Sequence, residues 1–522
     1  MISLYAYGTK EGLGFMHKKA VVTVHRDSVV GQTDDRLFGS FIEHIGRAVY
    51  GGLYDPGSAQ ADGSGFRKDV MELVRELRVP VVRYPGGNFV SGYNWEDGVG
   101  PVEKRPKRTE LAWFAVENNT FGTDEFVKWC GLAGTEPMLA VNLGTKGADS
   151  ARNLVEYCNH PRGTRYSDMR RANGYESPHG VRLWCLGNEM DGPWQIGHKT
   201  MHEYARVAHE TAKVMKWVDP SIELVACGSS NRGMPTFPKW ETAVLEETYE
   251  SVDYISMHIY LENMENDLKN FLAKSLIMDD YINSVVAACD YVKAVKRSKK
   301  RINISFDEWN VWYHSFDDNK KLTRWQEGPE FNEDMYTFED ALLVGSMLMS
   351  LLRRCDRVKI ACLAQLVNVI APIMAVSGGG VWKQTIFHPY LHASLYGRGA
   401  VLEAKVDTPL YDSKDFTDIP VLDTLCVADE EGGALTVFAV NRDCEEGVLA
   451  EYILSDFRDY RPVSHIVYEC GDMKAGNSPV DPNRVAPREA ELPAFDNGAL
   501  CAMFPKLSWN VVRLAAAGPA KA

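Results

Sequence analysis

Short apolar runs alternate with amphipathic stretches from residue 36 to about residue 397. Eight of these runs are apolar on both faces and are bounded by glycine, asparagine or proline, which is typical of parallel strands buried between helices and a barrel core. The stretches between them, such as 67–78 and 201–217, carry apolar residues at helical spacing. The expected strands are Arg36–Ile42, Val79–Arg83, Pro137–Leu143, Val181–Leu186, Ile222–Cys227, Tyr254–Met257, Ile302–Phe306 and Lys359–Leu366.

Eight strand–helix units in succession predict an α/β fold, a (β/α)8 TIM barrel with long loops. An open, doubly wound sheet is the competing arrangement. Its dinucleotide-binding members carry a GxGxxG turn after the first strand, and the chain has no such turn there. The barrel is therefore the predicted fold of the larger part of the chain.

The pattern changes after residue 397, where apolar and polar residues alternate in short segments separated by turns such as 430–433. Such segments indicate a C-terminal antiparallel β-sandwich, and the strand-like run 19–25 before the barrel is expected to join it. The predicted parts are an N-terminal extension (1–17), N-terminal strands of the sandwich (18–34), the catalytic barrel (35–396), the sandwich (397–516) and a tail (517–522).

The net charge and the cysteine pattern exclude several classes of binding partner and binding site. The formal net charge is -14, which argues against nucleic acid or an anionic membrane as the main partner, because both need basic surfaces. The 11 cysteines form no CxxC pair or Cys/His cluster, so we expect no metal site, no disulfide framework and a reducing, cytoplasmic compartment. The first residues lack the apolar core of a signal peptide, and no apolar run is long enough to span a membrane.

Two glutamates stand at the ends of expected strands. Glu189 follows the fourth strand in Gly-Asn-Glu-Met, and Glu308 follows the seventh in Phe-Asp-Glu-Trp-Asn. They are 308 − 189 = 119 residues apart, so only the fold can bring them together. Strand ends on one rim of a barrel meet at a single pocket, and two carboxyl groups facing one pocket can cleave a glycosidic bond.

A single glutamate at a strand end is more often solvated or ion-paired than catalytic. Two of them, both on the rim of an eight-unit barrel, favour function over that alternative. Asn188 is placed to bond a sugar hydroxyl, and Trp309 and Trp312 are candidate walls of the cleft beside Glu308.

Three segments, 83–95, 184–189 and 307–310, resemble the retaining α-L-arabinofuranosidases of glycoside hydrolase family 51. The Arg-Tyr-Pro-Gly-Gly-Asn sequence that starts at Arg83 is the most specific of the three, and the resemblance covers nearly the whole chain from about Lys18 onward. It implies a (β/α)8 barrel with a β-sandwich, no cofactor, and a homo-oligomer that is frequently a hexamer.

The resemblance also implies roles for single residues. Glu189 matches the general acid/base and Glu308 the nucleophile, while Tyr260 matches a tyrosine that keeps the nucleophile ionised. Each binding residue has a structural alternative: a rim salt bridge for Glu43, a turn position for Asn88, and core packing or buried-amide bonding for the others. The predicted substrate-binding residues are Glu43, Asn88, Asn188, His258, Tyr260, Gln365, Trp113 and Trp312.

Together with the two glutamates, the resemblance implies an exo-acting, retaining glycosidase that removes terminal α-L-arabinofuranosyl residues from arabino- and arabinoxylo-oligosaccharides in the cytoplasm. The expected partner is an oligosaccharide, with no nucleic acid, membrane, cofactor or metal. Three alternatives remain: a β-xylosidase or endo-β-glucanase on the same barrel, a catalytically inactive carbohydrate-binding protein, and a metal-dependent hydrolase.

Overall fold

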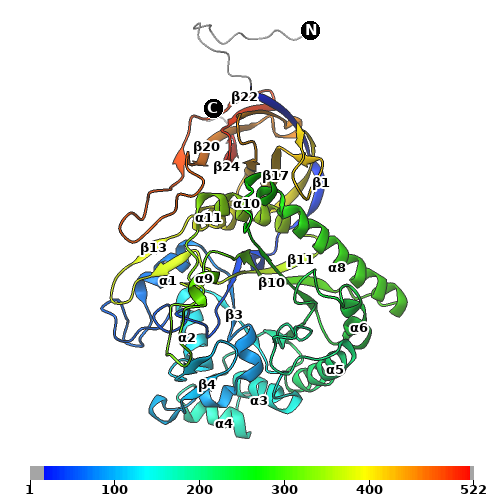
Figure 1. The fold of residues 1–522 in the computed structure, drawn as a ribbon. Helices are drawn as coiled ribbons and strands as arrows, with labels where there is room; N and C mark the ends of the chain where they lie inside the picture. Colours follow the sequence, from blue (N-terminus) through cyan, green and yellow to red (C-terminus); the bar gives the residue numbers. More distant parts are fainter. Residues whose placement is uncertain (1–16, 518–522) are drawn as a thin grey trace, which may run out of the picture.

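The computed structural model describes residues 17–517 and places a closed barrel beneath a separate ten-stranded sheet (Figure 1). All neighbouring barrel strands are parallel, and the ring runs β10-β11-β2-β3-β6-β7-β8-β9. The predicted TIM barrel is therefore confirmed. Its strands are β2 (Gly39–Phe41), β3 (Val81–Tyr84), β6 (Glu136–Ala140), β7 (Leu183–Leu186), β8 (Glu223–Ala226), β9 (Tyr254–Leu261), β10 (Asn303–Val311) and β11 (Val358–Ala364).

The limits of all eight strands differ from the prediction by one or more residues, and the first, sixth and seventh strands show the differences that bear on the site. The first apolar run begins with a 3₁₀ turn, η1 (Asp35–Phe38), because the Asp34 side chain accepts a bond from the Arg36 amide, and only 39–41 are strand. The sixth and seventh strands continue several residues beyond their predicted ends. Glu308 was expected after the seventh strand and instead lies inside β10.

A bulge in β10 explains why a glutamate inside a strand can still face the cavity. Ser305 pairs with Ser256 of β9 and Glu308 pairs with His258, so three steps along β10 match two steps along β9. The pairing with β11 shifts at the same place. Such a bulge breaks the alternation of faces and turns a side chain in a new direction, often beside an active site.

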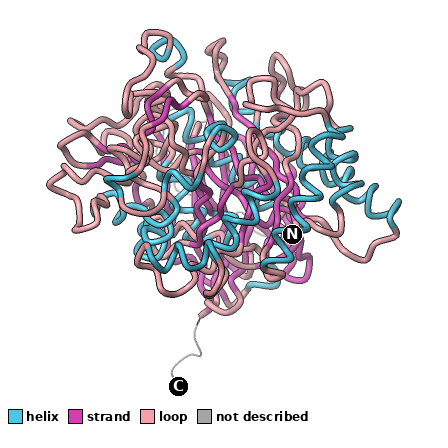
Figure 2. Tube along the Cα trace, turned by 90° about the horizontal axis from the view of Figure 1, so that it is seen from below, coloured by secondary structure: helices cyan, strands magenta, loops and turns pink. Residues whose placement is uncertain are grey.

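Helices surround the barrel, and the view from below shows strands gathered towards the centre of the molecule (Figure 2). The amphipathic stretches 67–78 and 201–217 form α1 and α5, as predicted. Every residue of α10 except Arg353 is buried, because this helix lies between the barrel and the C-terminal sheet. The helices are α1 (Lys68–Glu76), α2 (Thr123–Ala133), α3 (Ala148–Asn159), α4 (Arg165–Ala172), α5 (Met201–Val218), α6 (Lys239–Thr248), α7 (Leu268–Ala273), α8 (Ser275–Lys296), α9 (Phe316–Asn319), α10 (Phe338–Arg353) and α11 (Phe387–Tyr396).

The C-terminal sheet includes the N-terminal strand β1, as expected. This strand pairs antiparallel with β14 and parallel with β19, so it connects two parts of the sheet. A separate apolar core lies inside the sheet, with Val22, Val437 and Phe504 among its fully buried residues. The strands, in sheet order, are β21 (Arg488–Glu489), β20 (Tyr460–Glu469), β24 (Ser508–Ala516), β18 (Ala434–Asn441), β17 (Leu422–Asp429), β14 (Ala400–Asp407), β1 (Lys18–Gln32), β19 (Val448–Ile453), β23 (Ala499–Phe504) and β22 (Ala494–Asp496).

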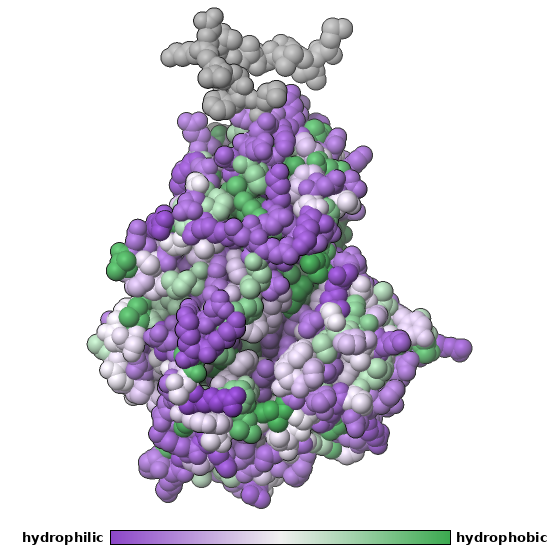
Figure 3. Space-filling view, viewed as in Figure 1, coloured by the Kyte–Doolittle hydropathy of each residue, from purple (hydrophilic) through white to green (hydrophobic). Residues whose placement is uncertain are grey.

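The predicted N-terminal extension and tail lie outside the described residues, apart from one residue of each, and the exact domain limits stay predictions. On the face seen in Figure 3, hydrophilic side chains predominate and hydrophobic ones form scattered areas between them. In residues 17–517, none of the helices combines the length and apolar character that a membrane crossing needs. The remaining elements are the hairpins β4 (Arg108–Glu110)–β5 (Ala115–Glu117), β12 (Ile373–Ala375)–β13 (Val381–Lys383) and β15 (Leu410–Tyr411)–β16 (Ile419–Pro420), and the 3₁₀ turns η2 (Asn88–Gly92), η3 (Trp95–Gly98), η4 (Val102–Lys104) and η5 (Ser455–Phe457).

Candidate active site

A cavity of about 480 Å³ opens at the rim of the barrel where the parallel strands end. Active sites of TIM-barrel enzymes lie at this C-terminal rim because the loops that follow all eight strands converge there. Both candidate catalytic glutamates line the cavity. The lining residues are Glu43, Ile45, Gly87, Asn88, Trp113, Glu189, Trp194, Ser230, Asn231, Tyr260, Glu308, Trp312, Asn332, Gln365, Val369 and Ile370.

Glu308 is held from both oxygens. The Arg83 guanidinium donates from Nη1 to Oε1 at 2.6 Å, and the Tyr260 hydroxyl donates to Oε2 at 2.9 Å. Glu308 and Arg83 are buried, so both bonds act where water does not compete with them. Charge-assisted donors of this kind stabilise a carboxylate and fix the direction of its lone pairs.

Glu189 lies three residues beyond the end of β7, with its backbone in the left-handed region at a φ of 45°. Residues other than glycine rarely adopt this conformation, and such strain gathers at functional sites. The Trp194 indole donates to Oε2 at 2.8 Å, and Nδ1 of His258 lies 2.9 Å from Oε1. The side chain is thus fixed at the cavity wall by one neighbour in its own loop and one in β9.

The two glutamates approach each other closely. One carboxylate oxygen of Glu189, one of Glu308 and a ring nitrogen of His258 all lie within 4.8 Å of one another. A single atom of a small ligand can therefore contact both carboxyl groups at once. This is the juxtaposition that the two sequence motifs predict, and the fold produces it between residues 119 positions apart in the chain (308 − 189 = 119).

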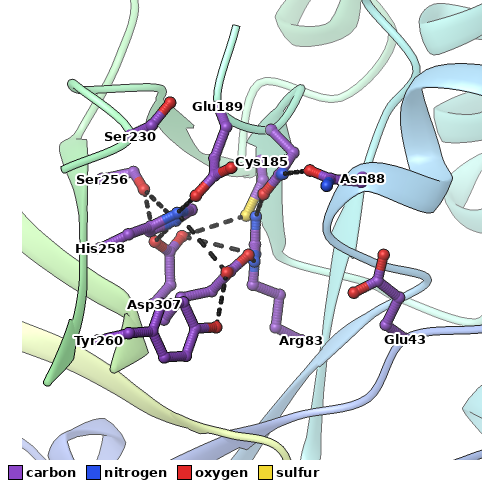
Figure 4. Close-up of polar contacts among 12 residues, drawn as sticks. Glu43, Arg83, Asn88, Cys185, Glu189, Ser230, Ser256, His258, Tyr260 and Asp307 are labelled. Carbon is purple, nitrogen blue, oxygen red and sulfur yellow. Dashed lines mark hydrogen bonds and ion pairs between the residues drawn. The ribbon is translucent and has the colours of Figure 1, made fainter. Parts of the chain in front are cut away.

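His258 connects Glu189 to a buried ion pair, as the dashed contacts in Figure 4 show. Its Nε2 lies 3.1 Å from Asp307, which also accepts a bond from the Ser256 hydroxyl and lies 3.6 Å from the Arg83 guanidinium. Burial alone would lower the pKa of His258, but the charges and hydrogen bonds of Glu308, Asp307 and Glu189 outweigh burial and raise the pKa to about 10. His258 is therefore a cation at neutral pH.

The cluster of Glu189, His258 and Glu308 has the spacing of a metal site, and among the residues that the structure describes it is the one such group. A histidine that binds a metal ion must be neutral, with a free lone pair on the coordinating ring nitrogen. His258 carries protons on both ring nitrogens, and both face carboxylates. The cluster is therefore better suited to proton transfer than to a cation, and independence from metal stays a prediction that insensitivity to EDTA would check.

Glu43 is a buried residue of the cavity wall. Its Oε1 accepts bonds from the Phe89 amide and the Trp113 indole, each at 2.9 Å, and its own amide donates to Gln365 at 2.9 Å. A Cβ on Gly87 would come within 2.3 Å of Oε2, so only glycine permits this approach of the β3 loop. The second glycine of the Pro-Gly-Gly-Asn segment thus has a steric role.

Glu43 makes the stability of the protein depend on pH. Burial raises the pKa of Glu43 to about 8, the charge of Glu308 adds to the shift, and the bonds from Phe89 and Trp113 oppose it. The folded protein keeps this proton up to about pH 8, whereas the unfolded chain releases it near the ordinary value of 4.5. The contribution of this proton to the free energy of unfolding is therefore complete below pH 4.5. It decreases by up to about 1.4 kcal/mol per pH unit as the pH rises from 4.5 and is lost once the pH has passed through 8.

Urea unfolding at pH 5, 6.5, 8 and 9 measures this effect. Glu43→Gln, which keeps the shape and cannot titrate, is the matched control. We expect the wild-type free energy of unfolding to decrease relative to the Gln variant between pH 5 and 8 and to level off above. Parallel curves for the two proteins over the whole range would show that Glu43 titrates at its ordinary value.

The structure brings all the predicted site residues to one region. Six of the eight predicted binding residues line the cavity, whereas Asn188 and His258 contact lining residues from behind. Asn188 accepts a bond from Arg83 at 2.7 Å, so its carbonyl oxygen is already used within the protein. The expectation for Trp309 was wrong: it is fully buried in the apolar core between the barrel and the surrounding helices, because the β10 bulge directs it away from the cavity.

Sequence reasoning missed several residues. Arg83 and Asp307 lie within the motifs but had no predicted role, yet Arg83 bonds Glu308 and Asp307 contacts His258. Trp194 follows Glu189 by five residues in a Gly-Pro-Trp loop, and that short spacing was the available signal. Ser230 and Asn231 follow β8, and only the strand position could have indicated them.

The chain matches two family models and several known proteins. Residues 73–294 match the α-L-arabinofuranosidase 1 domain, and residues 307–508 match the α-L-arabinofuranosidase C-terminal domain. The chain is 59% identical over 497 residues to the intracellular exo-α-(1→5)-L-arabinofuranosidase 1 of Bacillus subtilis, covering 95% of this chain and 99% of that one. The chain belongs to the α-L-arabinofuranosidases of glycoside hydrolase family 51.

Solved structures of family 51 agree with the fold. A family 51 α-L-arabinofuranosidase from Bifidobacterium longum superposes with a TM-score of 0.92 at 42% identity, covering 95% of this chain and 100% of that one. The arabinofuranosidase of Thermotoga maritima in its arabinose complex gives a TM-score of 0.84 at 32% identity, with 95% and 100% covered. The chain is also 45% identical to an exo-α-(1→6)-L-arabinofuranosidase of Bifidobacterium longum over 94% of this chain and 97% of that one, so relatives with different linkages share this sequence pattern.

Proposed function

We propose that this family 51 enzyme is an exo-acting, retaining α-L-arabinofuranosidase that hydrolyses terminal non-reducing arabinofuranosyl residues of arabino- and arabinoxylo-oligosaccharides. The observation that carries the proposal is the approach of Glu189 and Glu308 to within 4.8 Å across one wall of the cavity. Retaining glycosidases hold their carboxyl groups about 5–5.5 Å apart, whereas inverting ones leave about 6.5–9.5 Å for a water molecule.

The enclosed end of the cavity supports exo action. Glu43 and Gln365 are each 3% exposed, and the Trp113 indole donates to Glu43, so these three side chains form a buried part of the cavity wall. A terminal sugar can enter such a pocket, whereas the middle of a chain would need a cleft open at both ends. The carboxyl, amide and indole groups offer both donors and acceptors, as sugar hydroxyls require.

In the first step Glu308 attacks the anomeric carbon, and Glu189 gives a proton to the leaving oxygen. Nδ1 of His258 lies 2.9 Å from Glu189 Oε1, so a proton can pass directly between the imidazole and this carboxyl group. In the second step Glu189 takes a proton from water, which attacks the same carbon and releases arabinose from Glu308. The two inversions together keep the α configuration.

Product configuration tests the proposal. With an aryl α-L-arabinofuranoside in dilute methanol, ¹H NMR should show methyl α-L-arabinofuranoside as the transfer product, because methanol replaces water in the second step. A β-configured product, or no transfer product, would contradict retention. Aryl β-xylosides and β-glucosides in the same assay distinguish the competing glycosidases, and binding of arabinose without any hydrolysis would indicate an inactive binding protein.

Location and assembly also belong to the proposal. Relatives from Bacillus subtilis and Halalkalibacterium halodurans are named intracellular, which supports a cytoplasmic enzyme acting on imported short oligosaccharides. A homo-oligomer, a hexamer by family resemblance, stays a prediction. Light scattering on the purified protein would give its mass.

A further inference from the structure

A second hollow adjoins the catalytic cavity. It has a volume of about 500 Å³ and lies over the rim between the end of β9 and the loop after β8. Asn231 and Tyr260 line both the catalytic cavity and this hollow, so the two spaces meet at these two side chains. A ligand that extends out of the cavity past Asn231 and Tyr260 therefore reaches the hollow next.

The hollow lies on the side where the leaving group departs. Glu189 gives its proton to the leaving oxygen, so the leaving sugar must stand on the Glu189 side of the cavity. The Ser230 amide donates to Asp191, two residues after Glu189, at 3.0 Å, which places the loop after β8 beside the acid/base. In Figure 4, Ser230 stands on the Glu189 side and Glu43 on the other.

The lining of the hollow suits a neutral sugar. The Asn231 carbonyl oxygen accepts a bond from the Gly233 amide at 2.8 Å, and among residues 17–517 no acceptor is found for its NH₂ group. Arg232 is half-exposed and contributes guanidinium donors, while Phe237 and Ile277 contribute apolar surface. Donors next to apolar surface match the hydroxyl edge and the C–H face of a pentose ring.

We infer that this hollow, here the distal hollow, binds the second sugar of the leaving oligosaccharide, a pentose two units from the cleaved bond. The inference rests on the proposed function, since it needs cleavage of a terminal residue at Glu189 and Glu308. It assigns the enzyme a preference for substrates of three or more sugars over disaccharides. The first leaving sugar fills the space beside Glu189, and the next one meets Asn231 and Arg232.

The experiment compares kcat/KM for α-(1→5)-linked arabinotriose and arabinobiose, with an aryl arabinoside as reference. In wild type, kcat/KM for the trisaccharide should exceed kcat/KM for the disaccharide. Arg232→Ala should reduce the ratio of these two constants by about threefold to tenfold, the value of one or two hydrogen bonds. Ile277→Trp, which fills the distal hollow, should reduce it at least as much. The effect should appear in KM, because the second sugar lies far from the reacting carbon.

Asp280→Asn is the matched control. Arg232 forms a half-exposed ion pair with Asp280 at 2.6 Å, and this variant breaks the pair while keeping the guanidinium. Its ratio should equal that of wild type. The inference is overturned if wild type does not favour the trisaccharide, if Arg232→Ala leaves the ratio unchanged, or if Asp280→Asn lowers it equally. Failure of the proposed function would look different, because wild type would then not hydrolyse the aryl arabinoside.

Discussion

Replacing Glu308 by alanine is expected to lower kcat on an aryl α-L-arabinofuranoside by about 10⁴-fold or more, since no other group can form the bond to the anomeric carbon. Nearby carboxyl groups cannot substitute: Glu43 is protonated at neutral pH, and Asp307 is fully buried behind His258. Steady-state rates with a fluorogenic substrate at high enzyme concentration measure the loss.

Folding must be checked in this variant, because it leaves the Arg83 guanidinium without its partner at 2.6 Å. Glu308→Gln keeps one oxygen that accepts from Arg83, and its NH₂ group can donate to the Tyr260 hydroxyl oxygen, so this variant serves as the control for shape. Both variants should lose activity equally if the nucleophile is what matters. A Gln variant with near wild-type kcat would mean that Glu308 only holds Arg83 in place.

The architecture could be predicted from the sequence because the strands of a barrel are buried on both sides and their apolar runs are local signals. The β10 bulge could not be predicted from the sequence, because it depends on how residues 303–311 pair with β9 and β11, which are separated from them in the chain. The sequence therefore identified Glu308 but placed it after the strand, and the same bulge made Trp309 a false candidate for the cleft wall.

Within the site, residues that belong to a local sequence motif could be predicted, whereas contacts between distant parts of the chain could not. Glu189 and Glu308 carry sequence motifs, and the motif around Arg83 contributes Asn88. The link from Ser256 through Asp307 and His258 to Glu189 has no such local signal, because it joins side chains of β9, β10 and the loop after β7. Barrel closure creates that link, so only the structure could show it.

The buried charges of the site balance as a set. Arg83 and His258 are cations, and they oppose the carboxylates of Asp307 and Glu308 at distances of 2.6–3.7 Å. The raised pKa of Glu43 removes a third negative charge at neutral pH. Unpaired buried charges cost several kcal/mol each, so a balanced set is what allows this many ionisable groups inside one small region.

Replacing Glu189 by alanine is expected to affect substrates according to their leaving groups. An oligosaccharide alcohol needs a proton to leave, so kcat should fall by about 10²–10⁴-fold, the usual contribution of general acid–base catalysis. A nitrophenolate leaves without that proton, so the first step should remain fast and the covalent intermediate on Glu308 should accumulate. Burst kinetics with 4-nitrophenyl α-L-arabinofuranoside measure this accumulation.

Azide makes the test of Glu189 specific. The alanine side chain leaves space beside Trp194, and azide attacks without general-base help, so added azide should restore turnover of the nitrophenyl substrate and yield an α-configured arabinofuranosyl azide. Trp194→Phe keeps the carboxyl group and should show no rescue. If azide left Glu189→Ala unchanged, or if rescue gave the β azide, then Glu189 would not be the group that activates water on the face opposite Glu308.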